Sequence, residues 1–189
     1  MDADAEHIQI IRSKRKTMAI QIRDGALIVR APLRTGTIQI QQFLEKNRSW
    51  IDRHLEKARA AQRNAVQEGL LSEGDMKRLA EEALQVIPQR VAYYADRMGV
   101  TYGRITIRNQ RTRWGSCSAK GNLNFNCLLM LAPPEVLDAV VVHELAHRKE
   151  MNHSDRFYAV IREVYPDYPK WNRWLKENGS VLLGRMRGM

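Results

Sequence analysis

The chain has 189 residues, a formal net charge of +10 and 44% hydrophobic residues. This length suits one compact domain, or one domain with a smaller module, and the hydrophobic fraction is enough for a sizeable core. No apolar run approaches the roughly 18 residues of a membrane span, and the acidic N-terminus lacks the basic and apolar parts of a secretion signal. The two cysteines are too few for a disulfide framework, so we expect reduced thiols in a cytoplasmic protein.

The first third of the chain is predicted to form strands and then a helix. Alternating apolar and polar residues indicate short strands over residues 7–12, 17–23 and 26–31. Helical spacing of apolar residues follows over 37–64, and a glycine-containing segment at 67–74 is the expected linker. These patterns predict a β-rich N-terminal module with its helix over 1–70 and a second domain over 71–189.

The second domain is predicted to mix helices with short strands. Helices are expected over 74–98, from 133 to about 147, over 155–164 and over 168–178, with strands over 104–108, 112–117 and 121–129. In the last strand Leu123, Phe125 and Cys127 alternate with three asparagines, so one face is apolar and the other carries amides.

One stretch of the second domain has the pattern of a metal site. It runs His-Glu-Leu-Ala-His from His143 to His147, and His153 follows. Residues four apart share a helix face, so the imidazoles of His143 and His147 can bind one metal ion. Glu144 lies beside them, where it can reach a metal-bound water, and His153 is a natural third ligand. The residues just before the motif are mostly apolar, which favours a buried helix. We therefore predict a zinc-dependent hydrolase, with a peptidase as the first choice.

The chain also resembles a known family, the YgjP-like metallopeptidases, which are related to the SprT-like and WLM zinc peptidases. The matching strings in the second domain lie at 111–118, 121–126, 141–147 and 152–154, together with Phe157. Further matches in the first domain lie at 12–16, 29–32 and 46–51. The sequence departs from the family pattern at Arg148, where leucine is usual, and at Ala139, where tyrosine is frequent.

The resemblance implies a fold, a cofactor and residue roles. The implied fold is α+β and zincin-like, of the minimal gluzincin type, with the active-site helix under a small antiparallel sheet. His143, His147 and His153 are then the ligands of a zinc ion, and Glu144 is the general base that activates water.

The substrate-binding residues are less determined by the sequence. Arg113, Asn126 and Tyr158 are the candidates for stabilising the oxyanion and binding substrate, and Tyr165 is a further possibility. If the strand at 121–129 forms the edge of the sheet, its backbone and amides would align an extended peptide. The alternative is an ordinary strand whose polar residues face water.

Three classes of function follow. The first is a zinc metalloendopeptidase acting on a protein or peptide substrate. The second is a zinc hydrolase of nucleotide phosphoanhydrides, because the same activated water could attack phosphorus. The third is a DNA-associated protease, or a nucleic-acid protein with a structural zinc. A structural zinc would need a fourth ligand, and no fourth Cys or His lies near the motif.

A weak nucleic-acid contact is suggested by an acid-free basic stretch that contains Arg97, Arg104, Arg108, Arg111, Arg113 and Lys120. No membrane partner is expected.

Overall fold

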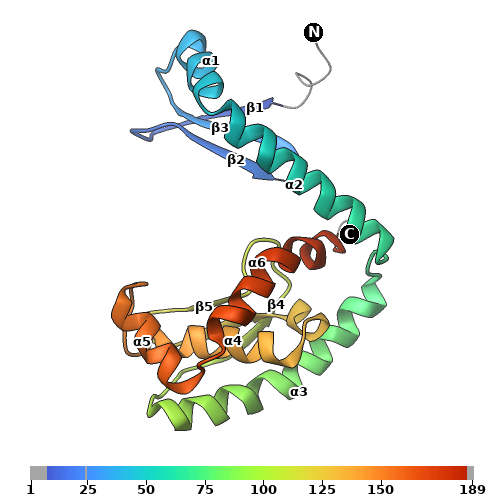
Figure 1. Cartoon of the computed structure of the whole chain (residues 1–189), viewed down its shortest axis with the longest axis vertical. Coiled ribbons are helices and arrows are strands. Elements are labelled where there is room, and N and C mark those ends of the chain that lie inside the picture. The colour runs from blue at the N-terminus through green and yellow to red at the C-terminus, as the bar shows by residue number, and fades with distance from the viewer. Residues whose placement is uncertain (1–7, 24, 187–189) are drawn as a thin grey trace. The chain divides into compact units, whose positions relative to one another are not determined.

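The computed structural model describes residues 8–23 and 25–186, so His7 of the first predicted strand lies outside it. The chain divides into two compact units, residues 1–64 and 65–189 (Figure 1). Each unit contains helices and a three-stranded sheet, which confirms the α+β fold class. Among the described helices, none combines the length and the apolar composition that crossing a membrane requires.

The N-terminal unit is built on a small mixed sheet. Its elements are β1 Ile8–Ser13, β2 Ala19–Arg23, β3 Ala26–Pro32, α1 Thr37–Lys46 and α2 Arg48–Gln67, whose last residues fall in the second unit. The central strand β3 pairs parallel with β1 and antiparallel with β2. The single helix predicted over 37–64 is in fact two helices. The chain breaks at Asn47, whose side-chain amide donates to the carbonyl of Phe43 at 2.7 Å and so satisfies the last turn of α1.

The C-terminal unit holds most of the buried residues. Its elements are α3 Glu73–Met98, β4 Ile105–Arg108, β5 Gly115–Cys117, β6 Leu123–Asn126, the 3₁₀ helix η1 Cys127–Leu131, α4 Pro134–Ala146, α5 Asp155–Val164 and α6 Tyr168–Gly184. A capping box between Ser72 and Asp75 begins α3, and Gly99 ends it in the left-handed region at φ 62°.

The sheet of this unit corrects two expectations. Its order is β4-β6-β5, with β6 parallel to β4 and antiparallel to β5, so the sheet is mixed and not purely antiparallel. The first of the two interpretations of the strand over 121–129 made it an edge strand, but β6 is the central strand. It also stops at Asn126, because the side-chain oxygen of Asn126 accepts from the amide of Leu128 at 3.1 Å and starts the 3₁₀ turn.

The helix α4 is buried as its apolar sequence predicts. It contacts β5, α3, α5 and α6, and Figure 1 shows it running through the unit between α3 and α6. Its one buried aspartate, Asp138, accepts two hydrogen bonds of 2.7 Å from the Arg90 guanidinium and one of 3.1 Å from the Tyr94 hydroxyl. This bidentate pair satisfies the buried carboxylate and joins α4 to α3.

The last helix is longer than predicted. We expected it to end near Gly179, but α6 continues to Gly184. Gly179 is buried against the Trp114 indole, and a Cβ added there would lie 3.0 Å from Cζ2 of that ring. Gly179 therefore lets Trp114, the residue before β5, pack closely against α6. It does not end the helix.

Candidate metal centre

Three histidine side chains of the C-terminal unit converge on one point. Ring nitrogens of His143, His147 and His153 all lie within 4.8 Å of one another. The Nε2 atoms of His143 and His153 are 3.1 Å apart. The structure thus brings together the three residues that the sequence indicated, and among the described residues no further histidine, cysteine or carboxylate belongs to the group.

The end of α4 explains how the third histidine reaches the other two. His143 and His147 are about one helical turn apart, and His147 is the C-cap residue directly after α4. The chain then turns tightly, with two successive amides donating to the carbonyl of Ala146 at 3.0 and 2.9 Å. It returns through His153 to Ser154, whose side chain caps the N-terminus of α5. The end of α4 and the beginning of α5 therefore determine the position of His153.

A buried phenylalanine forms the floor of the cluster. The ring of Phe157 is fully buried, and its centroid lies 4.9, 4.6 and 4.8 Å from those of His143, His147 and His153 respectively. Because phenylalanine has no hydrogen-bonding group, it positions the imidazoles by packing and leaves their nitrogens available to a ligand.

Two of the imidazoles are also positioned by hydrogen-bond partners at Nδ1. Nδ1 of His143 lies 2.8 Å from the Tyr168 hydroxyl, and Nδ1 of His147 lies 3.2 Å from the backbone carbonyl of Glu150. When Nδ1 carries the ring proton it donates to these oxygens, and the lone pair of Nε2 then faces the shared point. Partners of this kind fix the tautomer and orientation of metal-binding histidines.

This donor set fits a zinc ion. Three imidazole nitrogens with an open fourth position are a ligand set of catalytic zinc sites, and Zn–N distances of about 2.0–2.1 Å place tetrahedral ligand atoms about 3.4 Å apart. The observed 3.1 Å between Nε2 of His143 and His153 is close to that spacing. Burial, and then the neighbouring imidazoles, lower the pKa of His143 to about 4, and burial lowers the pKa of His147. Both rings are therefore unprotonated at neutral pH, as metal binding requires.

Glu144 lies beside the cluster in a tightly packed place. Its side chain is 5% exposed, and burial raises its pKa to about 8. Gly115 of β5 packs directly on it: an added Cβ would lie 2.6 Å from Oε1 and 2.7 Å from Cγ of Glu144. Only glycine leaves room for this carboxylate, so β5 determines where the Glu144 side chain points.

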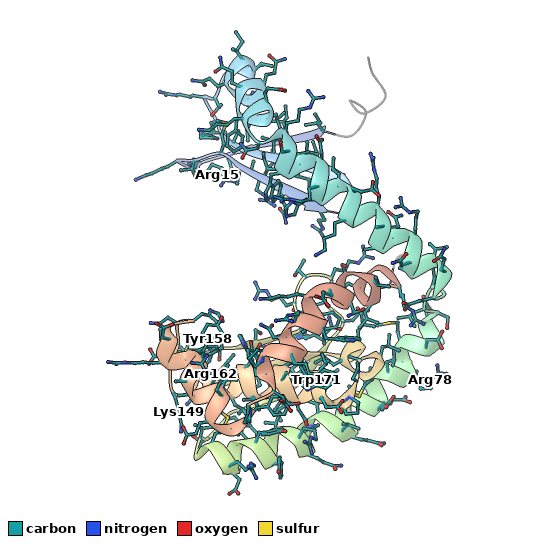
Figure 2. The ribbon with its side chains drawn as sticks, in the orientation of Figure 1. Arg15, Arg78, Lys149, Tyr158, Arg162 and Trp171 are labelled. Carbon is teal, nitrogen blue, oxygen red and sulfur yellow. The ribbon has the colours of Figure 1, made fainter. Side chains whose placement is uncertain are left out.

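A cavity of about 290 Å³ opens beside His143 and Glu144. Its walls are largely aromatic and aliphatic, with Trp114, Trp171 and Leu175 among them (Trp171 is labelled in Figure 2). A metal ion, a buried carboxylate and a substrate group could therefore meet at one place.

A family model described as the metallopeptidase domain of YgjP-like proteins matches residues 16–77 and 73–178. The chain belongs to the YgjP-like family. The resemblance seen in the sequence is thereby confirmed, and the histidine cluster lies within the second matched segment.

Individual relatives match smaller parts of this YgjP-like chain. The UTP pyrophosphatase of Escherichia coli (strain K12) is 36% identical over 58 residues, which are 31% of the chain and 35% of that protein. The match thus spans about a third of that relative. The metallopeptidase zymogens abylysin of Pyrococcus abyssi and jannalysin of Methanocaldococcus jannaschii are 20% and 19% identical, both with a TM-score of 0.44. Each structural match covers 49% of this chain. The matches cover 94% of the abylysin chain and 96% of the jannalysin chain.

The structure removes Asn126 from the substrate-binding candidates. Asn126 is only 1% exposed, and its side-chain amide donates to the carbonyls of Gln110 at 2.6 Å and Arg113 at 3.0 Å. Its oxygen accepts from Leu128, as described above. The residue is therefore a structural link between β6 and the loop before β5. The amphipathic pattern of the strand could not show that the Asn126 side chain is buried.

The other candidates have different surroundings. Arg113 lines the cavity beside Glu144, as a substrate-binding residue should. The Tyr158 ring lies 6.5 Å from that of His153, within reach of the same site. Tyr165 instead donates to the carbonyl of Glu135 at 3.0 Å and has a structural role.

Two residues of this YgjP-like site were missed in the sequence. Tyr168 was considered only as the beginning of the last helix, and no local pattern connects it with a histidine 25 residues away. Gly115 had a detectable signal, because a glycine within a predicted strand often marks a close approach of another group.

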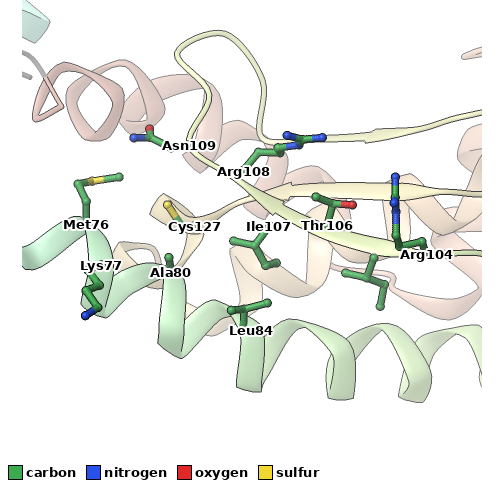
Figure 3. A pocket seen from close by; sticks show the side chains of 11 residues that line it. Met76, Lys77, Ala80, Leu84, Arg104, Thr106, Ile107, Arg108, Asn109 and Cys127 are labelled. Carbon is green, nitrogen blue, oxygen red and sulfur yellow. The ribbon is translucent and has the colours of Figure 1, made fainter. Parts of the chain in front are cut away.

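A larger cavity, of about 640 Å³, lies elsewhere in this unit, between α3 and β4 (Figure 3). None of its lining residues belongs to the histidine cluster. Arg104 and Arg108 line it, whereas Arg113 lines the cavity beside Glu144. Three of the six basic residues in the acid-free stretch thus line two different cavities, and the nucleic-acid contact remains a prediction.

Replacing Gly115 by alanine should lower activity without removing the metal. The added methyl group must displace the Glu144 carboxylate, and a misplacement of about 1 Å can cost about 10²-fold in rate. The measurements are turnover and zinc content of the purified variant. Gly103→Ala is a matched control, because its Cβ would crowd Asn122 Oδ1 at the same 2.6 Å. Equal activity losses in both variants would contradict the special role of Gly115.

Replacing Tyr168 by phenylalanine should weaken zinc binding by about 10–100-fold, the usual effect of removing a group that orients a ligand. The ring remains, so packing is preserved while His143 loses its hydroxyl partner. Zinc dissociation constants from chelator competition measure the effect. Tyr165→Phe, which removes a hydroxyl bonded to Glu135, should leave zinc affinity unchanged. An unchanged zinc affinity in Tyr168→Phe would show that this hydroxyl has no positioning role.

Proposed function

We propose that this protein is a zinc-dependent endopeptidase of the HExxH type, which hydrolyses peptide bonds with Glu144 as general base. The observation that carries the proposal is the placement of a buried carboxylate beside three converging imidazoles. Membership of a family whose model is described as a metallopeptidase domain supports the same class of enzyme. Both cysteines are free thiols, which suits a reducing compartment, and we therefore propose a cytoplasmic location.

The number of protein ligands supports a catalytic rather than a structural metal. Structural zinc sites are normally closed by four protein ligands, whereas catalytic sites keep one position open. The described residues supply His143, His147 and His153 to this group and no fourth ligand. When bound, zinc supplies Lewis acidity and lowers the pKa of coordinated water from about 15.7 to about 7.

The surrounding side chains would carry out the proton transfers and the positioning. Burial raises the pKa of Glu144 to about 8 in the metal-free chain, but a dication bound beside it would favour the ionised form. The carboxylate would then accept a proton from the attacking water and return it to the leaving amine. Gly115 packs against Glu144 and limits where its side chain can lie. The Tyr168 hydroxyl positions His143 through a hydrogen bond. Arg113, on the wall of the same cavity, could donate to the oxyanion that develops on the substrate.

The strand that would align a peptide is β5, not β6. β5 is an edge of the sheet, and its Gly115 touches Glu144. An extended peptide that paired with this edge would lie directly beside the carboxylate. Recognition by strand addition relies on main-chain hydrogen bonds, so it would tolerate varied side chains.

A second candidate is hydrolysis of nucleotide phosphoanhydrides. The observation in its favour is the local similarity to a protein named UTP pyrophosphatase. The cavity beside Glu144 also combines the Arg113 guanidinium with the indoles of Trp114 and Trp171, groups able to bind phosphate and to stack on bases. We do not extend the proposal to a DNA-associated protease, because Arg104 and Arg108 line a different cavity from the one that Arg113 shares with Glu144.

One comparison distinguishes the two candidates. The zinc-loaded protein is incubated separately with unfolded proteins and with nucleoside triphosphates, and Glu144→Gln serves as the blank. We expect proteolysis that disappears in the variant, because Glu144 is the proposed general base and the edge strand β5 offers backbone groups with which an extended peptide could pair. Triphosphate hydrolysis that disappears in Glu144→Gln, with no proteolysis, would make the second candidate correct.

A further inference from the structure

A separate cavity of about 480 Å³ lies between α5 and α6. Three cationic side chains line it, Arg162 from α5 and Arg173 and Lys176 from α6, and none of its lining residues is acidic. Tyr158 and Tyr168 complete the wall nearest the histidines. Figure 2 labels Tyr158 and Arg162 on α5.

No acidic side chain lines the cavity beside the three cations, although Glu177 follows Arg173 by four residues on α6. All three are exposed, and none of them forms an ion pair with a described residue. Arg173 and Lys176 are three residues apart on α6 and so lie on one face, opposite Arg162. Like charges around one cavity repel each other, and an anion bound between them would relieve that repulsion.

The cavity is joined to the metal centre through its tyrosines. The Tyr158 ring centroid is 6.5 Å from that of His153 and 6.4 Å from that of Tyr168. Tyr168 in turn bonds to His143 at 2.8 Å. Tyr168 and Asn172 line both this cavity and the one beside Glu144. A substrate that extends past these two residues would therefore enter the basic cavity.

We propose that the basic cavity binds carboxylate side chains of an acidic peptide substrate, at positions away from the bond that is cleaved. The inference rests on the proposed peptidase function and adds a preference for acidic segments. Arginine forms planar, two-point hydrogen bonds with carboxylates, and a lysine beside it adds a further charge. The cavity between two helices has room for a few side chains. A polynucleotide would need a continuous basic surface, and Arg104 and Arg108 line a different cavity.

The test measures binding without turnover. The full chain carrying Glu144→Gln is loaded with zinc, and a short fluorescein-labelled peptide with clustered glutamates is titrated by fluorescence anisotropy. Arg173→Glu and Lys176→Glu, each added to this background, should weaken binding about tenfold, because each replaces an attraction by a repulsion. Arg156→Glu is the matched control: this exposed arginine of α5 does not line the cavity, and the change in net charge is the same. It should bind the peptide like the parent.

Three outcomes would overturn the inference. One is equal weakening by Arg156→Glu and Arg173→Glu, which would indicate a diffuse effect of net charge. Another is equally tight binding of the same peptide with glutamines in place of glutamates. The third is binding of tripolyphosphate, dependent on Arg173, without binding of the glutamate peptide. Because this assay needs no catalysis, a failure of peptide hydrolysis by the parent protein would be recognised separately.

Discussion

Replacing His147 by alanine should leave the purified protein without bound zinc. His147 supplies one of three nitrogens that lie within 4.8 Å of one another, and its loss leaves a two-ligand site completed by water. The affinity should fall by more than about 100-fold, which is the upper range for groups that merely orient a ligand. Elemental analysis after exhaustive dialysis measures the zinc content per chain.

The control for this variant is another histidine. His54 stacks on Trp50 in the N-terminal unit, with ring centroids 3.9 Å apart, and takes no part in the cluster. His54→Ala should keep the parent's zinc content. A zinc content in His147→Ala equal to that of the parent would remove His147 from the metal site.

Glu144→Gln should keep the metal and the fold but lower the rate of hydrolysis by about 10²–10⁴-fold, the range for a positioned acid–base group. Glutamine has nearly the same shape, so it fits the space beside Gly115 that an added methyl group would fill. Its amide cannot accept the proton of the attacking water. Initial rates on any substrate that the parent hydrolyses, together with zinc content, measure the two effects.

Glu135→Gln provides the comparison within the same helix. Glu135 is exposed in the first turn of α4, away from the histidines, and its substitution should change the rate little. Undiminished turnover by Glu144→Gln would exclude Glu144 from the mechanism, whatever the metal content. A loss of zinc in that variant would mean that Glu144 contributes to metal binding and not solely to proton transfer.

The local parts of the site could be predicted from the sequence. The helical period alone places His143 and His147 on one face, and the apolar residues before them correctly indicated a buried helix. The serine directly before the helix predicted over 155–164 is likewise a local N-cap pattern, and Ser154 caps α5 at the end of the loop that contains His153. Such features depend on residues a few positions apart, so a single stretch of chain contains the information.

Strand order was decided by tertiary structure. Alternation of apolar and polar residues shows that 123–126 is a strand with two unlike faces, but it does not show which strands lie on either side of it. Because β4 and β5 both pair with β6, neither backbone edge of β6 is free to pair with a peptide, and the Asn126 side chain bonds to a neighbouring loop. The edge beside the candidate site is β5, the short part of the strand predicted over 112–117 that forms a ladder with β6.

The contacts that position the proposed catalytic groups were likewise decided by long-range packing. Tyr168 of α6 contacts His143, which is 25 residues away along the chain, and Gly115 of β5 contacts Glu144 from a different element. No sequence periodicity predicts contacts between residues so far apart. The cations at 162, 173 and 176 are scattered over two helices, and only the packing of α5 and α6 places them around one cavity. The sequence by itself thus determined which residues can bind a metal and activate water. Tertiary structure decided their orientation and the shape of the cavities around them, because both arise from contacts between distant segments.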